Sequence, residues 1–166
     1  MFNLYQYDYA FYVIENHSSN HQAGYEPGSN ILEERVSPMK IDFEHDLDKE
    51  FIYSIGYSAD KDPSLRHCAE RNTVINGIPS YSNFWLNQCA MTGGASGGAW
   101  IKDMDESGSG TLISLNSWGF SHKVGMAGPN LQTKSGSCAQ TLFNKARRSS
   151  NPGTRVKGYI VTTCED

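Results

Sequence analysis

The chain has 166 residues, enough to bury the core of one ordinary domain, and its formal net charge is −4. This acidic balance gives no basic field for a phosphate backbone, so we expect no nucleic-acid partner. No run approaches the roughly 18 apolar residues of a membrane-spanning helix, so we expect no membrane partner either. Sixteen glycines together with 11% aromatic residues favour an all-β domain over a helical bundle.

The predicted elements are mostly short strands. Residues 1–8 have no basic region, apolar core or cleavage site, so they do not form a signal peptide. Residues 15–30 and 58–66 are rich in turn residues and are predicted loops. Aromatic and β-branched runs predict strands, in chain order, at 9–14, near Ile41 and Phe43, and at 51–57, 73–75, 84–86, 99–101, 111–115 and 159–162.

Two longer patterns complete the predicted fold. The strands 99–101 and 111–115 flank a polar turn and suit a hairpin. Because strands recur without long helices between them, the sequence predicts a sandwich or barrel and not a parallel α/β sheet. Residues 138–148 are the best helix candidate, with Ser137 as the N-cap residue and an apolar side made by Leu142, Phe143 and Ala146.

The glycine-rich segment 89–100 carries the strongest chemical signal. It places Ser96 between Gly94 and the pair Gly97-Gly98. A nucleophilic serine needs a tight, exposed turn and backbone N–H groups aimed at the oxygen that becomes negative, and glycines allow both. The alternative interpretation is a glycine-rich β-turn with an incidental serine.

The residues around Ser96 resemble those of trypsin/chymotrypsin-like serine proteases, in particular the glutamyl endopeptidase-like branch. Gly94-Ala95-Ser96-Gly97-Gly98 is similar to the Gly-x-Ser-Gly-Gly motif, and Ser117-Trp118-Gly119 to the substrate-binding strand. Tyr7-Asp8-Tyr9-Ala10 resembles the Asp-x-Ala around the triad aspartate, and Gly56-Tyr57-Ser58-Ala59 the Gly-Tyr-Pro-Ala of the glutamyl branch. The similarity spans about residues 7–130.

The resemblance implies a serine endopeptidase that acts on polypeptides by acyl transfer. Ser96 would be the nucleophile, Asp8 would orient a histidine base, and the N–H groups of Gly94 and Ser96 would hold the oxyanion. There is no carboxylate at Ala90, and Asn116 stands where the glutamyl branch has a histidine. We therefore expect a small or apolar residue, and not Lys, Arg or Glu, before the scissile bond. The implied substrate-binding residues are Ala90, Met91, Asn116, Ser117, Trp118 and Gly119.

The chain departs from the family at the histidine. The family's histidine precedes the aspartate, whereas only residues 1–7 precede Asp8 here and none of them is a histidine. We therefore expect a fragment that begins after the histidine and is close to inactive alone. Residues 1–44 would be the last part of the first β-barrel and the connection between barrels. Residues 45–166 would form the second antiparallel β-barrel, with one short helix in the C-terminal region. Ala95, where the family commonly has Asp or Asn, argues against trypsin-type zymogen activation.

Four cysteines are compatible with two disulfides and match no zinc pattern, which favours an oxidising compartment and a secreted protein. Cys68 and Cys89 flank the strands that lead to the nucleophile, where a disulfide would brace the wall of the specificity pocket; two free buried thiols are the alternative. A Cys138–Cys164 bridge is inferred mainly by elimination. We expect no cofactor, no metal and, for the complete protein, a monomer.

Two other functions fit parts of the sequence. A protease-like β-barrel without the histidine would suit a non-catalytic binding module. Gly-x-Ser-x-Gly is also the nucleophile elbow of α/β-hydrolase-type esterases, in which Asp103 or Asp105 with His122 would complete the order of the triad. That elbow leads into a helix, whereas residues 97–101 lead into a predicted strand, so the esterase is the weaker interpretation.

Overall fold

The regular structure of the described chain is mainly short β-strands, as the sequence predicts, with a single α-helix in the described residues. The computed structural model describes residues 4–12, 37–44, 49–59, 64–74 and 83–148. The helices are η1 and η2, two 3-10 turns at Leu4–Tyr7 and Thr133–Ser135, and α2 at Ala139–Arg148. The strands are β1 Lys40–Ile41, β2 Phe51–Tyr57, β3 Leu65–Arg71, β4 Thr73–Val74, β5 Phe84–Leu86, β6 Ala99–Lys102, β7 Thr111–Leu115 and β8 Met126–Gly128.

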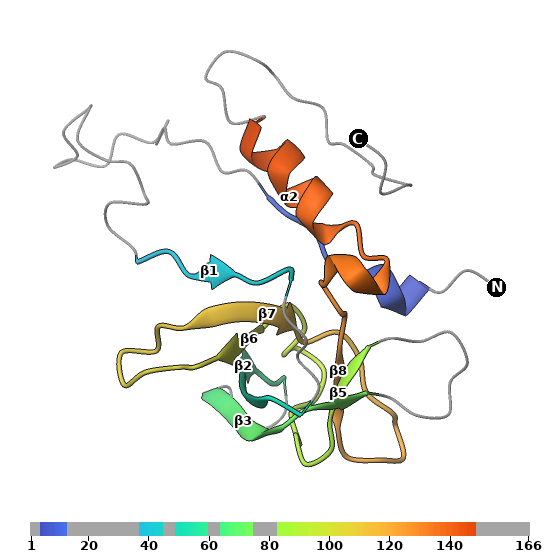
Figure 1. The fold of residues 1–166 in the computed structure, drawn as a ribbon. Helices are drawn as coiled ribbons and strands as arrows, with labels where there is room; N and C mark the ends of the chain where they lie inside the picture. Colours follow the sequence, from blue (N-terminus) through green and yellow to red (C-terminus); the bar gives the residue numbers. More distant parts are fainter. Residues whose placement is uncertain (1–3, 13–36, 45–48, 60–63, 75–82, 149–166) are drawn as a thin grey trace, which may run out of the picture.

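The described strands form two sheets and no closed ring. The larger sheet has the order β1-β7-β6-β2-β3, and the smaller one β4-β5-β8. All pairs are antiparallel except β1 with β7, which is parallel. The predicted hairpin is confirmed as β6 and β7, which pair antiparallel with an irregularity between Trp100 and Ile101. In Figure 1 the two sheets lie together below α2.

Strand β2 forms because its sequence alternates between the two faces of the sheet. Ile52, Ser54 and Gly56 are buried, whereas the residues between them are half-buried or exposed. A period of two is the signature of a strand with one covered face. This strand is central to the site because β6, which follows Ser96 in the chain, pairs with it through residues 52–54.

The main core lies between the sheets and includes the glycine-rich turn. Trp100 is fully buried at its centre, and Ala95 is only 1% exposed. Ala95 therefore anchors the turn in the apolar core, which fixes the position of the residue after it, Ser96. The other members of this core are Ile52, Phe84, Leu86, Cys89, Met91, Ile113 and Met126.

The N-terminal aromatic segment is not a strand, so the prediction for 9–14 is wrong for its described residues 9–12. Tyr9 shares a 3.1 Å hydrogen bond with Ser137, and the ring of Phe11 lies 5.4 Å from that of Phe143. The segment runs beside α2 in Figure 1. Tyr9 and Phe11 are therefore half-buried beside the helix and not in a sheet, whereas Tyr12 is exposed. Burial raises the pKa of Tyr9.

Several predicted strands and the predicted helix are confirmed, whereas one predicted loop is too long. Strands β2, β5, β6 and β7 and the helix match, and Ser137 accepts the N–H of Ala139 at 3.2 Å, as expected of an N-cap residue. The loop predicted at 58–66 is wrong at its end because β3 begins at Leu65. The predicted loop 15–30 and strand 159–162 lie outside the described residues. No helix in the described ranges is long and apolar enough to cross a bilayer.

Candidate active site

Ser96 sits on an exposed turn between the core and strand β6. Gly94 and Gly97 on either side have left-handed backbone angles, with φ of 96° and 80°. The turn is closed by two hydrogen bonds, in which the N–H of Ala95 donates to Thr92 O at 3.2 Å and the N–H of Gly98 donates to Ala95 O at 3.1 Å. Ser96 is exposed and its hydroxyl makes no hydrogen bond within the described residues.

Two glycines of the motif are required by space. A Cβ at Gly98 would lie 2.0 Å from the carbonyl oxygen of Ile55, so this position packs directly on strand β2. A Cβ at Gly94 would lie 2.8 Å from the nitrogen of Ala59, and its positive φ is also unfavourable for other residues. Two glycines of the motif are therefore needed because the backbone of the turn packs directly against the backbone of residues 55 and 59.

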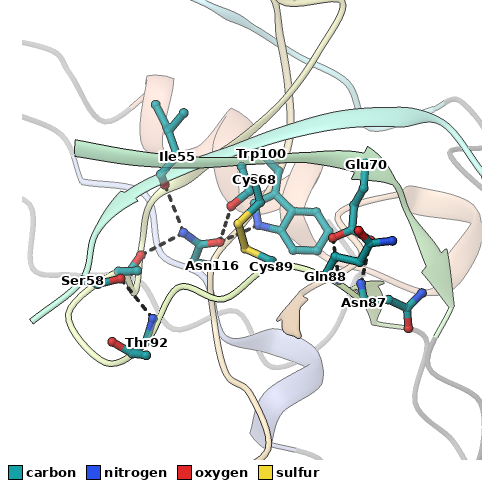
Figure 2. The surroundings of a disulfide bond; sticks show 12 residues. Ile55, Ser58, Cys68, Glu70, Asn87, Gln88, Cys89, Thr92, Trp100 and Asn116 are labelled. Atoms are coloured by element: carbon teal, nitrogen blue, oxygen red, sulfur yellow. Dashed lines mark hydrogen bonds between the residues drawn. A yellow bond between two sulfur atoms is a disulfide. The ribbon is translucent and has the colours of Figure 1, made fainter. Parts of the chain in front are cut away.

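The end of β2 holds the loop before the turn. The N–H of Thr92 donates to Ser58 Oγ at 3.0 Å, and the N–H of Ala59 donates to Gly93 O at 2.7 Å. Figure 2 shows the first of these bonds. The Gly-Tyr-Ser-Ala motif at 56–59 and the serine motif are thus neighbours in the fold.

Two N–H groups on the turn are available for a ligand. Those of Gly94 and Ser96 donate to no acceptor within the described residues. Unpaired amides at an exposed serine and two residues before it are the donors that an oxyanion needs.

Asp8 and the serine turn are joined to the same segment of chain. The hydroxyl of Ser117 donates to Asp8 Oδ2 at 2.5 Å. The preceding residue, Asn116, accepts the N–H of Gly97 and donates its own N–H to Gly98 O, each at 2.8 Å. Residues 116 and 117 therefore connect the exposed carboxylate to the nucleophile turn.

The segment 117–119 presents free backbone groups next to this connection. Trp118 pairs with Ala127 in an isolated antiparallel bridge. The carbonyl of Ser117 and both main-chain groups of Gly119 make no hydrogen bond among the described residues. An extended chain has room to add to these groups as a strand. The Trp118 ring packs edge-on against Phe120, with centroids 5.0 Å apart.

The residues expected to line the specificity pocket differ in their exposure to solvent. Ala90 is exposed, whereas Met91 is buried in the main core. Asn116 is 1% exposed, and its amide oxygen accepts from Ser54 Oγ at 2.6 Å and from Trp100 Nε1 at 2.7 Å. Figure 2 shows Asn116 between the carbonyl of Ile55 and the indole ring of Trp100.

Solved structures give the comparison. No protein-family model and no curated protein matches the chain. A thermostable serine protease, AL20, from an extremophilic microorganism is 26% identical, with a TM-score of 0.56 over 68% of this chain and 50% of that one. The protease Anisep from Arthrobacter nicotinovorans is 27% identical, with a TM-score of 0.60 over 76% of this chain and 54% of that one. A Glu endopeptidase solved with MPD is 17% identical and shares the fold, with a TM-score of 0.52 over 70% of this chain and 50% of that one.

The fold is that of trypsin-like serine proteases. The resemblance to these proteases predicted from the sequence is thereby confirmed, and the fold is also that of a Glu endopeptidase. The chain spans about half the length of the solved proteases that it matches.

The loop before the serine motif of this protease-like fold is held by a disulfide. Cys68 on β3 and Cys89 are bonded, with Cα atoms 5.2 Å apart, as predicted. Two residues after Cys68 on the same strand, Glu70 accepts the N–H groups of Asn87 and Gln88, both at 2.8 Å (Figure 2). The carboxylate thus fixes the backbone just before Cys89, a role that the sequence alone did not suggest.

Only one cysteine of the second predicted disulfide lies in the described residues. Cys138 is disulfide-bonded, but its expected partner, Cys164, lies outside the described residues. The one described disulfide and the bonded state of Cys138 are compatible with an oxidising compartment.

No histidine is joined to Ser96 or Asp8 by a hydrogen bond in the described part of the chain. His67 is exposed on β3, and His122 lies against Phe120 with ring centroids 5.5 Å apart. His17, His21 and His45 fall outside the described residues. The described ranges also contain no group of three His, Cys, Asp or Glu residues able to hold a metal.

The described residues do not have the arrangement of an α/β-hydrolase. Ser96 is followed by strand β6 and not by the helix that a nucleophile elbow requires. Asp105 accepts bonds within its own turn from the hydroxyl of Ser107 and the N–H of Ser109, which lower the pKa of its carboxyl. Neither Asp103 nor Asp105 is hydrogen-bonded to His122 in the described residues, so the esterase interpretation is wrong.

Proposed function

We propose that this chain carries the nucleophile, the oxyanion N–H groups and the orienting aspartate of a serine endopeptidase. The observation that carries the proposal is the link from Asp8 through Ser117 and Asn116 to the exposed Ser96 turn. A glycine-rich surface turn of no function would not require an exposed carboxylate to be bonded to the adjoining segment. The similarity to two solved serine proteases at 26% and 27% identity supports the same function.

The chemistry is acyl transfer. The Ser96 oxygen attacks the carbonyl carbon of the peptide, and its proton passes to a histidine base that Asp8 orients. The carbonyl oxygen becomes negative and is held by the N–H groups of Gly94 and Ser96. Collapse expels the amine, which takes the proton from the histidine, and water then releases the acyl group by the reverse sequence of proton transfers.

The substrate is an extended polypeptide. It would pair with the carbonyl of Ser117 and the main-chain groups of Gly119, while Trp118 and Phe120 offer an apolar surface beside it. Ala90 is exposed and carries no charge. If Ala90 lines the specificity pocket, a small or apolar side chain before the scissile bond would suit it. We propose no direct contact of substrate with the buried amide of Asn116.

We further propose the wider assignment that the sequence suggests. Residues 1–44 would close a first β-barrel and 45–166 form the second, in a secreted monomer that binds no nucleic acid and no membrane. All five histidines of the sequence follow Asp8, so the base would come from outside this sequence. Loss of the triad histidine reduces kcat by about 10⁶, so the chain alone would be nearly inactive.

The experiment is to label the chain with a fluorophosphonate probe while adding imidazole as an external base. The Ser96 oxygen bonds to phosphorus, fluoride leaves, and the hydroxyl proton passes to imidazole. We expect slow labelling of Ser96 that rises with imidazole concentration. Labelling should vanish in Ser96→Ala and be unchanged in Ser121→Ala, an exposed serine outside the turn.

Each outcome separates the alternatives. No labelling of Ser96 at any imidazole concentration would exclude the nucleophile and favour the non-catalytic binding module. Labelling without imidazole at the rate of an intact protease would retain the nucleophile and refute the proposed lack of a base. Peptide mapping of the labelled product identifies the modified serine in either case.

A further inference from the structure

We infer that Asn116 is the positioning residue that aims the N–H of Ser96 at the oxyanion. This inference rests on the proposed function, because it concerns one of the two N–H donors of that site. It differs from the role in substrate binding that the sequence suggested for Asn116. The evidence is the set of hydrogen bonds made by the buried amide and by the main chain of this residue.

The amide orientation of Asn116 is fixed by its partners. Its oxygen accepts from two groups that donate, the Ser54 hydroxyl and the Trp100 indole N–H. Its nitrogen donates to two groups that only accept, the carbonyl oxygens of Ile55 and Ala95, each at 3.0 Å. All four positions are used, so the amide is saturated. A flipped amide would oppose the indole N–H and both carbonyls, and only the Ser54 hydroxyl could reverse its role, so the amide has one orientation.

The bond to Ala95 determines where the next N–H points. The carbonyl of Ala95 and the N–H of Ser96 belong to one peptide unit, which is planar and trans. In such a unit the C=O and N–H bonds point in opposite directions. Two donors, Asn116 Nδ2 and the N–H of Gly98, hold the Ala95 oxygen toward the buried side. The N–H of Ser96 is therefore directed away from the core, on the side of the exposed serine.

The other oxyanion N–H is set in the same way by a different donor. The carbonyl of Gly93 accepts the N–H of Ala59 at 2.7 Å, and this bond turns the N–H of Gly94 away from β2. A backbone donor serves Gly93, whereas Ala95 depends in part on a side chain. The methyl side chain of Ala95 cannot itself make a hydrogen bond to hold the turn. Asn116 is thus the side chain through which substitution can reach the Ser96 N–H.

The test uses Asn116→Asp, which keeps the shape but replaces two donors by an acceptor facing two carbonyls. The matched control is Ser114→Ala, which removes a buried 2.7 Å hydrogen bond to Pro129 O from strand β7, two residues before Asn116. Trp100→Phe is a second variant, because it removes one partner that fixes the amide and keeps Asn116. Its effect should have the same direction and be smaller, and it replaces Asn116→Asp if that variant does not fold.

Two readouts are needed for the folded variants. Crystal structures of the wild type and the variants show the orientation of the 95–96 peptide, whatever the activity. The rate of imidazole-dependent labelling at Ser96, per folded molecule, reports the oxyanion donor. Loss of one such donor reduces a rate by about 10²–10³. We expect a rotated peptide and about a hundredfold loss of rate in Asn116→Asp, and less than a threefold change in Ser114→Ala.

Different results would overturn the role of Asn116 and the proposed function. An unchanged 95–96 peptide in Asn116→Asp, or an equal loss of rate in Ser114→Ala, would overturn the role of Asn116 and leave the nucleophile in place. Absence of wild-type labelling would overturn the proposed function. The peptide orientation would then still decide whether Asn116 holds the turn.

Discussion

The hydroxyl of Ser117 donates a 2.5 Å hydrogen bond to Oδ2 of Asp8, which lies 109 positions earlier in the chain. This bond ties the N-terminal segment to the segment beside the serine turn. Asp8 is exposed, so its position depends on such partners and not on being enclosed by the core.

Replacing Ser117 by alanine should therefore loosen residues 4–12. A hydrogen bond of this kind contributes about 1 kcal/mol, so we expect hydrogen exchange in this segment to be about fivefold faster. Mass spectrometry after deuterium labelling measures it. Ser121→Ala, at an exposed position four residues later, is the control and should leave exchange unchanged. Equal exchange in Ser117→Ala and the wild type would mean that the packing of Tyr9 and Phe11 on α2 holds the segment alone.

Two neighbouring glycines should respond very differently to alanine. At Gly98 the new methyl group would lie 2.0 Å from Ile55 O and 2.7 Å from Asn116 Nδ2, so the backbone would have to move. We expect a loss of at least about 3 kcal/mol in the free energy of unfolding. Gly97 has open space but a φ of 80°, so Gly97→Ala should cost only about 1–2 kcal/mol. Urea unfolding measures both, and similar losses would contradict the close packing of Gly98 on β2.

The Cys68–Cys89 disulfide should contribute about 2–4 kcal/mol to stability, because it closes a loop of 21 residues. The double variant Cys68→Ala/Cys89→Ala should lose that amount in chemical unfolding under oxidising conditions, where Cys138 keeps its own disulfide. Wild type in reductant is the comparison, since both of its bridges open. A loss well under about 1 kcal/mol would show that Glu70 and the core hold the loop without the covalent bond.

The pKa of Asp105 should rise toward its ordinary value of 3.8 in Ser107→Ala, because the Ser107 hydroxyl is the main group that lowers it. In the wild type the associated stabilisation is present above pH 3.8 and is lost as the pH falls through the lower folded pKa. NMR titration of the carboxyl carbon measures the shift, with Ser121→Ala as the control. An unchanged pKa in Ser107→Ala would assign the effect to the N–H groups of Ser107 and Ser109.

The elements predicted correctly are those whose sequences carry their own signal. Strand β2 alternates between faces, β5 is wholly apolar, and α2 has an N-cap residue and an apolar side. Strand β3 was missed because its sequence, Leu-Arg-His-Cys-Ala-Glu-Arg, is polar and its residues are half-buried at most. Strand β8, Met-Ala-Gly, has no strand preference of its own and forms because it pairs with β5.

The site likewise has a part that the sequence indicates and a part that only the fold reveals. Ser96 and its glycines are contiguous, so a local motif indicates them. The contact of Asp8 with Ser117 and the saturated amide of Asn116 depend on residues that the fold brings together from distant segments. A single sequence contains no pattern for such contacts. The sequence predicts a substrate-binding role for Asn116 because it contains no sign of the four internal hydrogen bonds that its side chain makes.

Strand β3 borders the larger sheet among the described strands, with no neighbour on one side. A bare edge of this kind is a template on which a second molecule can pair, and it invites aggregation. Arg66, His67, Glu70 and Arg71 place polar or charged groups along nearly the whole strand. The same composition that hides β3 from prediction would therefore discourage edge-to-edge assembly, and the disulfide at Cys68 limits the fraying through which such assembly starts.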